Sequence, residues 1–154
     1  MTNNTGYAGL ILRLALGVMF ISHGLMKVLV FTLPGTVGFF ESIGYPGWLA
    51  YLVILGEVGG GALLILGVCT RWIALANTLI LLGSIPVHWG NGWMFSNEGG
   101  GWEYPVFLVA VSVAVALIGD GAYALRLPWG PEKRATDSAR DDRQRSFLAR
   151  NEAE

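Results

Sequence analysis

The chain has 154 residues and a formal net charge of −1; 53% of its residues are hydrophobic and only 14% are charged. Soluble domains usually carry about 25% charged residues, so this composition excludes an ordinary soluble domain and indicates a polytopic protein of the lipid bilayer. The near-neutral balance gives no field that would attract nucleic acid, and a single cysteine, Cys69, excludes an internal disulfide and a CxxC redox pair.

The first apolar run extends from about residue 8 to residue 31, which is long enough to cross a bilayer at about 1.5 Å per residue. The segment before it lacks the basic residues of a signal peptide, so we expect a retained membrane span. Glycine and proline residues then break the apolar pattern. Within this break, the sequence TVGFFESIG predicts a short amphipathic helix at the membrane interface.

Three further spans are predicted, over about 48–68, 72–88 and 102–125. The turn Cys69–Arg71 is very short, which makes the second and third spans antiparallel neighbours. A glycine-rich loop, NGWMFSNEGGG, precedes the fourth span. The expected fold is therefore all-α: a transmembrane antiparallel four-helix bundle, with a short amphipathic interfacial helix between spans one and two, in a single membrane domain over residues 1–125.

The region 126–154 is charged and nearly free of apolar residues, so it is predicted to be a solvated tail. With four spans, Arg71 and the arginine and lysine residues of this tail fall on one side of the membrane. The positive-inside rule then predicts that both termini and the Arg71 turn are cytoplasmic. No internal repeat favours a transporter architecture.

The second span carries one carboxylate, Glu57, near its middle. An ionisable group at this depth costs about 2.5–3.5 kcal/mol on insertion scales, so a partner is expected. In the first span, His23 and Lys27 lie four residues apart and therefore share a helix face. When the helices close into a bundle, five ionisable groups are predicted to meet in its outer half: His23, Lys27, Glu57, His88 and Glu103.

This outer cluster has three interpretations. In the first, Glu57 pairs with Lys27 or His23 and fixes the register of the helices. In the second, the cluster lines an outward-open pocket for a small polar or quinone-like ligand, with histidine and glutamate as proton carriers. In the third, His23, His88, Glu57 and Glu103 bind a metal. The spacing lacks HxxxH and ExxH patterns, and no metal is predicted.

A second set of charges lies nearer the predicted cytoplasmic side. Arg13 and Asp120 are at similar depth, and they either form a structural ion pair or reach the interface separately. Arg71 competes for Asp120 from the turn between the second and third spans.

Glycines in the first two spans predict close helix packing. Gly56 and Gly60 form a GxxxG pair in the second span, and Gly17 and Gly24 of the first span are expected to receive that face. No phosphate-binding motif accompanies these glycines.

The ordered set of these features resembles the DoxX family over about residues 9–125. The resemblance is carried by LRLALGVMFISHGLMK with Arg13, His23, Gly24 and Lys27, by GEVGGGALLILGVCTR with Glu57, Gly67 and Arg71, by GGWEYPVFL with Glu103, and by Asp120.

The resemblance implies a small four-helix integral protein of the bacterial cytoplasmic (inner) membrane. The family takes its name from a component linked to quinol oxidation and thiosulfate metabolism, and some relatives are implicated in oxidative or thiol stress. We therefore expect a protein that binds a quinone-like or other small ligand, or that supports a membrane redox or thiol-stress complex with a protein partner. The alternative is a non-enzymatic scaffold or assembly subunit whose intramembrane charges are structural. The pattern is compatible with an enzyme or a non-enzyme and with a homo-oligomer, and it suggests no cofactor other than a quinone.

Overall fold

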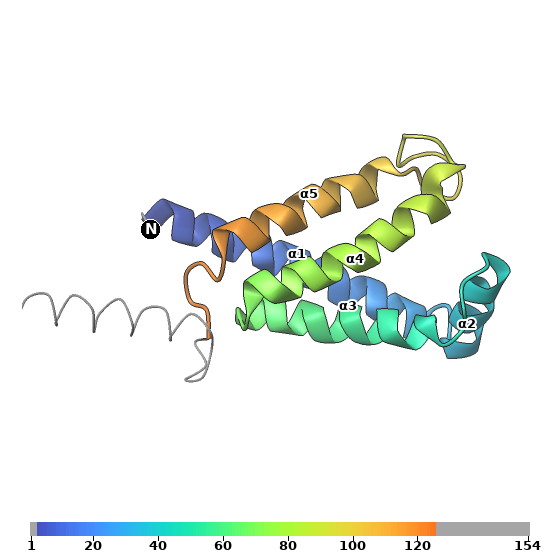
Figure 1. Ribbon diagram of the computed structural model, residues 1–154, viewed down its shortest axis with the longest axis horizontal. Helices are drawn as coiled ribbons and strands as arrows, with labels where there is room; N and C mark the ends of the chain where they lie inside the picture. The colour runs from blue at the N-terminus through green and yellow to red at the C-terminus, as the bar shows by residue number, and fades with distance from the viewer. Residues whose placement is uncertain (1–2, 126–154) are drawn as a thin grey trace, which may run out of the picture.

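The computed structural model describes residues 3–125, and the predicted tail over 126–154 lies outside them. The described chain forms five helices and no strand. In chain order they are α1 (Asn3–Leu29), α2 (Leu33–Ser42), α3 (Leu49–Leu66), α4 (Thr70–Trp89) and α5 (Glu103–Ile118). The all-α prediction, with a four-helix bundle and a short helix between its first two members, is confirmed (Figure 1).

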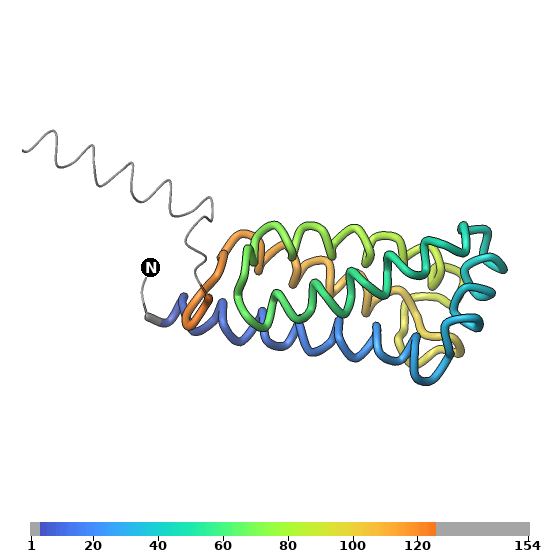
Figure 2. Tube along the Cα trace, turned by 90° about the horizontal axis from the view of Figure 1, so that it is seen from below, coloured from blue at the N-terminus to red at the C-terminus, as the bar shows by residue number. Residues whose placement is uncertain are grey.

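The four long helices run along one axis, and α2 lies across one end of them (Figures 1 and 2). α1 packs mainly on α3, and α4 packs mainly on α5. These two pairs approach each other where α3 turns into α4, and they diverge toward α2 and the loop before α5 (Figure 1). We call the first end, which contains Arg13, Thr70 and Asp120, the closed end. The other end, formed by α2 and residues 90–102, is the open end.

The α1–α3 contact depends on glycines that let the two backbones touch. A Cβ on Gly17 would lie 2.7 Å from the carbonyl oxygen of Gly61, and a Cβ on Gly61 would lie 2.7 Å from that of Gly17. Nearer the open end, a Cβ on Gly24 would lie 3.1 Å from the Cβ of Glu57. The glycines of α1 thus bring the Glu57 side chain close to the α1 surface.

The glycines Gly56 and Gly60 do not face α1 as predicted. A Cβ on Gly60 would meet the Asn77 side chain at 2.6 Å, and one on Gly56 would meet Ile80 at 2.7 Å. Both neighbours belong to α4. Successive residues of a helix point about 100° apart, since there are about 3.6 residues per turn. Gly61 therefore faces α1 while Gly60 faces α4.

The helix α5 ends at Ile118, earlier than the predicted limit near residue 125. The next residue, Gly119, has φ 83° and ψ −154°, a conformation that interrupts the helix and that glycine adopts most readily. The segment 119–125 then crosses the closed end as a strap. The amide of Ala122 donates to Gly6 at 2.8 Å, and that of Leu125 donates to Leu66 at 3.0 Å. The strap therefore ties α1 to the end of α3.

Three helices of the described chain, α1, α3 and α4, are long and apolar enough to cross a membrane. α5 is equally apolar in character but has only 16 residues. Leu55, Leu79 and Leu117 are each more than two-thirds exposed, which suits side chains that contact lipid. The interior is filled by one apolar cluster comprising Leu16, Phe20, Leu64, Ala74, Leu81, Leu108, Val115 and Ala116.

Candidate functional site

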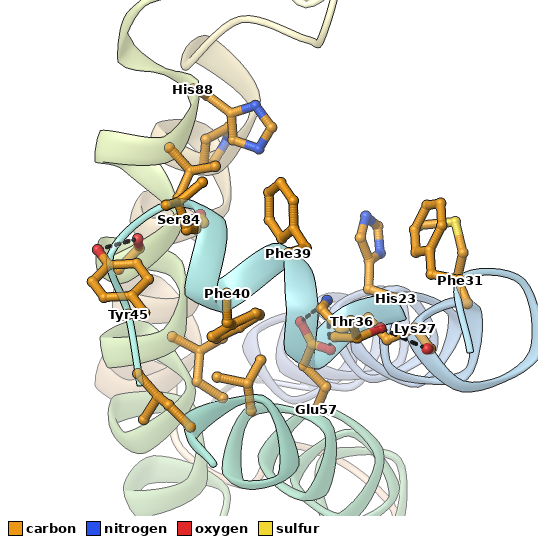
Figure 3. Close-up of a pocket in the computed structure, with 18 of the residues that line it drawn as sticks. His23, Lys27, Phe31, Thr36, Phe39, Phe40, Tyr45, Glu57, Ser84 and His88 are labelled. Carbon is orange, nitrogen blue, oxygen red and sulfur yellow. Dashed lines mark hydrogen bonds and ion pairs between the residues drawn. The ribbon is translucent and has the colours of Figure 1, made fainter. Parts of the chain in front are cut away.

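A cavity of about 990 Å³ lies at the open end, between the diverging helix pairs (Figure 3). Most of its wall is apolar, and α2 contributes Phe39 and Phe40 to it. Figure 3 shows His23 and Lys27 on α1, with Ser84 and His88 across the cavity on α4. A smaller space of about 140 Å³ adjoins it; that space shares these polar residues and extends to Phe20, Leu81 and Leu108 of the core.

An ion pair joins α1 to α3 at the base of the cavity. Lys27 Nζ donates to both carboxylate oxygens of Glu57 at 2.8 Å. Glu57 is 5% exposed, whereas Lys27 is half-buried and lines the cavity. Each charge therefore has the partner that a buried ionic group needs.

Both histidines of the chain line the cavity, and each is fixed through Nδ1. His23 Nδ1 lies 2.9 Å from the carbonyl oxygen of Met19, and its ring stacks on Tyr104 with centroids 6.3 Å apart. His88 Nδ1 lies 3.1 Å from the carbonyl oxygens of both Gly99 and Gly100. The glycine-rich loop therefore orients His88, and the helix backbone orients His23.

The fifth predicted member of this cluster lies elsewhere. Glu103 lines neither cavity, and its Oε1 accepts a hydrogen bond from the amide of Phe95 at 2.7 Å. As the first residue of α5, Glu103 reaches back to the loop rather than into the bundle. The structure therefore brings together four of the five predicted groups: His23, Lys27, Glu57 and His88. Within residues 3–125, no three His, Cys, Asp or Glu side chains gather closely enough to hold a metal.

Four hydroxyl groups line the cavity, those of Thr36, Tyr45, Ser84 and Tyr104, and sequence reasoning did not select them. Thr36 donates to the carbonyl of Lys27 at 2.8 Å, Tyr45 to that of Gly83 at 3.3 Å, and Ser84 to that of Leu81 at 2.7 Å. Thr36 and Tyr45 reach the site because α2 and the turn after it fold over the open end. The amphipathic pattern of that segment was the only signal in the sequence.

At the closed end, Arg13 is 1% exposed, and its hydrogen bonds within residues 3–125 all go to backbone carbonyls. Its guanidinium donates to Leu64 at 3.0 Å and Ile65 at 2.6 Å, and to Ala122 of the strap at 2.8 Å. Leu64 and Ile65 are in the last turn of α3, where carbonyls lack the amide four residues on; the carbonyl of Leu64 also accepts from the C-cap amide of Gly67 at 3.1 Å. Arg13 therefore donates hydrogen bonds to carbonyls at the end of α3 and links that end to the strap.

The predicted ion pairs of Asp120 are absent from the described chain. Asp120 Oδ1 instead accepts from the amide of Thr70 at 3.2 Å, in the first turn of α4. Arg71 is exposed, and its Nε donates to the carbonyl of Ala116 at 3.1 Å. The break after α5 explains the difference, because it directs Asp120 toward α4 while Arg13 meets the carbonyl of Ala122.

Comparison with known proteins gives a consistent picture. The model of the DoxX family matches residues 8–89, which include all four cavity groups. The chain is 35% identical over 116 residues to a Bacillus subtilis (strain 168) protein named "Putative oxidoreductase CatD", covering 75% of this chain and 82% of the relative. It is 30% identical over 122 residues to a protein of Escherichia coli (strain K12) named "Inner membrane protein YqjF", covering 75% and 87%. No solved structure matches the chain.

Proposed function

The chain belongs to the DoxX family of bacterial inner-membrane proteins, and from this premise we propose that its open-end cavity binds a small, uncharged, quinone-like ligand taken from the bilayer. The oxidoreductase name of the Bacillus subtilis relative supports a redox-associated ligand. The observation that carries the proposal is the cavity itself, with apolar walls and a few convergent polar groups.

The size and lining of the cavity suit an amphipathic ring compound. Ligand pockets generally occupy about 300–1,000 Å³ and combine apolar walls with a small number of placed polar groups. This cavity, at about 990 Å³, lies at the upper limit. Phe39 and Phe40 provide aromatic surface, while His23 and His88 provide polar contacts on opposite helices. A ring with polar edges and an apolar tail would complement both the aromatic surface and the histidine contacts.

The charges of the site favour a neutral ligand. Lys27 and Glu57 neutralise each other at 2.8 Å. A permanently charged ligand would have to compete with this pair, and separating a buried pair costs several kcal/mol. A neutral ring leaves the pair intact.

Transport would need a polar path through the molecule, but the smaller space ends on apolar side chains of the core. Phe20, Leu81 and Leu108 line the smaller space, and the carbonyl of Leu64 accepts from the Arg13 guanidinium. These residues belong to the continuous apolar core. We therefore propose binding from the open end rather than transport.

The test is a pair of glycine substitutions that differ only in their position relative to the cavity. Gly83 lines the cavity and Gly59 does not, and a Cβ at either position meets nothing within 4 Å. With the full chain in lipid nanodiscs, isothermal titration calorimetry with a short-chain ubiquinone analogue is expected to show saturable binding. Gly83→Phe should weaken it by at least about tenfold, which is roughly 1.4 kcal/mol, and Gly59→Phe should not. No saturable binding to the unaltered chain, or equal effects of the two substitutions, would overturn the proposal.

The second candidate is a scaffold whose buried charges hold the helices in register. The observation that favours it is the bidentate Lys27–Glu57 contact between α1 and α3. A scaffold role predicts that this pair stabilises the fold and that no quinone analogue binds.

A further inference from the structure

We propose that the open-end cavity selects the reduced, dihydroxy form of its quinone-like ligand over the oxidised, dicarbonyl form. This inference rests on the proposed function and adds the redox form of the ligand. It follows from counting which hydrogen-bond donors of the cavity wall are already used and which acceptors are left.

The protonated nitrogen of each histidine is identified by its partner. A backbone carbonyl has no hydrogen to donate, so the Nδ1 atom facing it must carry the proton. This holds for His23 against Met19 and for His88 against Gly99 and Gly100. In a neutral imidazole the other nitrogen, Nε2, is then an acceptor. Both cavity histidines therefore offer acceptors, one from α1 and one from α4.

Three of the four hydroxyl groups of the wall show the same pattern. Thr36, Tyr45 and Ser84 each donate their hydrogen to a backbone carbonyl. Each hydroxyl oxygen keeps lone pairs that accept but has no second hydrogen to donate. Five polar side chains that line the cavity therefore share one property: their donors are used by the backbone, and no donor within the described residues bonds to their remaining lone pairs.

Few side-chain donors remain to set against these acceptors. Lys27 has three N–H groups and directs two of them at the oxygens of Glu57. Its third N–H and the hydroxyl of Tyr104 are the remaining donors among the cavity side chains described above. A quinone carries two acceptor carbonyls and would bring them to an acceptor-rich wall. A hydroquinone carries two O–H donors, which can donate hydrogen bonds to the acceptors of the wall.

The size of the preference follows from one additional neutral hydrogen bond. Such a bond corresponds to roughly a tenfold change in affinity. Tenfold tighter binding of the reduced form raises the midpoint potential of the bound two-electron couple by about 30 mV. The cavity would therefore hold its ligand in the reduced state.

The experiment compares three forms of one ligand on the full chain in nanodiscs, without oxygen and at one fixed pH. The forms are a short-chain ubiquinone analogue, its hydroquinone, and the hydroquinone methylated on both oxygens. The methylated form keeps the ring and loses both donors. We expect the hydroquinone to bind about tenfold more tightly than either of the others. His23→Phe, which retains an aromatic ring beside Tyr104, should reduce this ratio to a few-fold or less.

The outcomes separate the two proposals. Saturable binding of all three forms with equal affinity, or tighter binding of the quinone, would overturn the selection of the reduced form and leave the proposed function standing. Binding of none of them would overturn both. The methylated ligand needs no substitution in the protein, so the result does not depend on a variant that folds.

Discussion

Each end of the bundle buries one charged side chain, and the two side chains have different kinds of hydrogen-bond partner. Arg13 at the closed end is 1% exposed, and Glu57 beside the open-end cavity is 5% exposed. In the part of the chain that the structure describes, the hydrogen bonds of Arg13 go to main-chain carbonyls of α3 and of the strap. Glu57 bonds to one side chain, Lys27, which also lines the cavity. The partners of Arg13 are main-chain atoms fixed by the fold, whereas the partner of Glu57 is a side chain that lines the cavity.

The segments that cross the two ends also differ in whether main-chain or side-chain hydrogen bonds hold them. At the closed end, backbone hydrogen bonds from Ala122 and Leu125 tie the strap to α1 and α3. At the open end, α2 and the turn after it are held to the bundle by two side-chain hydroxyls, those of Thr36 and Tyr45. The connecting segment at the closed end is thus tied through main-chain hydrogen bonds, whereas that at the open end is tied through side chains.

The largest effect is expected at the closed end. Arg13→Met removes the donor to the carbonyls of Ile65 and Ala122, whereas the carbonyl of Leu64 keeps its hydrogen bond from the amide of Gly67 at 3.1 Å. Each buried carbonyl left without a donor costs about 1–3 kcal/mol, so the free energy of unfolding should fall by about 2–6 kcal/mol. The measurement is denaturant unfolding in detergent micelles. The control is Arg71→Met at the exposed Arg71, with an expected loss below about 1 kcal/mol. Equal losses for the two arginines would show that the buried main-chain contacts of Arg13 stabilise the closed end no more than the exposed contact of Arg71.

A double-mutant cycle at the cavity should give an intermediate effect. Glu57→Gln and Lys27→Met each leave one charge unpaired, and the double substitution removes both. We expect the double variant to recover stability, with a coupling energy of about 1–3 kcal/mol. Glu103→Gln, which affects a contact with the loop amide of Phe95, serves as the carboxylate control and should cost less than about 1 kcal/mol. Additive losses would show that the 2.8 Å contact does not stabilise the fold.

The smallest effect is expected at the attachment of α2. Tyr45→Phe removes the hydrogen bond to Gly83 and keeps the aromatic ring against Phe40. Because this bond is exposed, the free energy of unfolding should fall by only about 0.5 kcal/mol. Exchange of a bound quinone analogue, followed by stopped-flow dilution, should become a few-fold faster as α2 loosens. Unchanged exchange rates would show that α2 does not control entry.

The sequence alone predicted the open end better than the closed end. His23 and Lys27 share a face because they are four residues apart, and a carboxylate at the depth of Glu57 requires a partner. Those two local facts are enough to anticipate the cluster that the structure brings together. Glu103 is the exception, because its side chain turns toward a loop whose path the sequence pattern does not specify.

At the closed end, the local sequence pattern gave a wrong prediction. The apolar run into residue 125 predicts continued helix, but Gly119 stops α5, and the strap that follows supplies Arg13 with a partner. Hydropathy and turn residues determine which segments become helices and in what order, because those properties act over a few neighbouring residues. Arg13 and Ala122 are 109 residues apart in the chain. Which buried group meets which carbonyl, and which glycine faces which helix, depends on how the helices pack, and only the tertiary structure decides it.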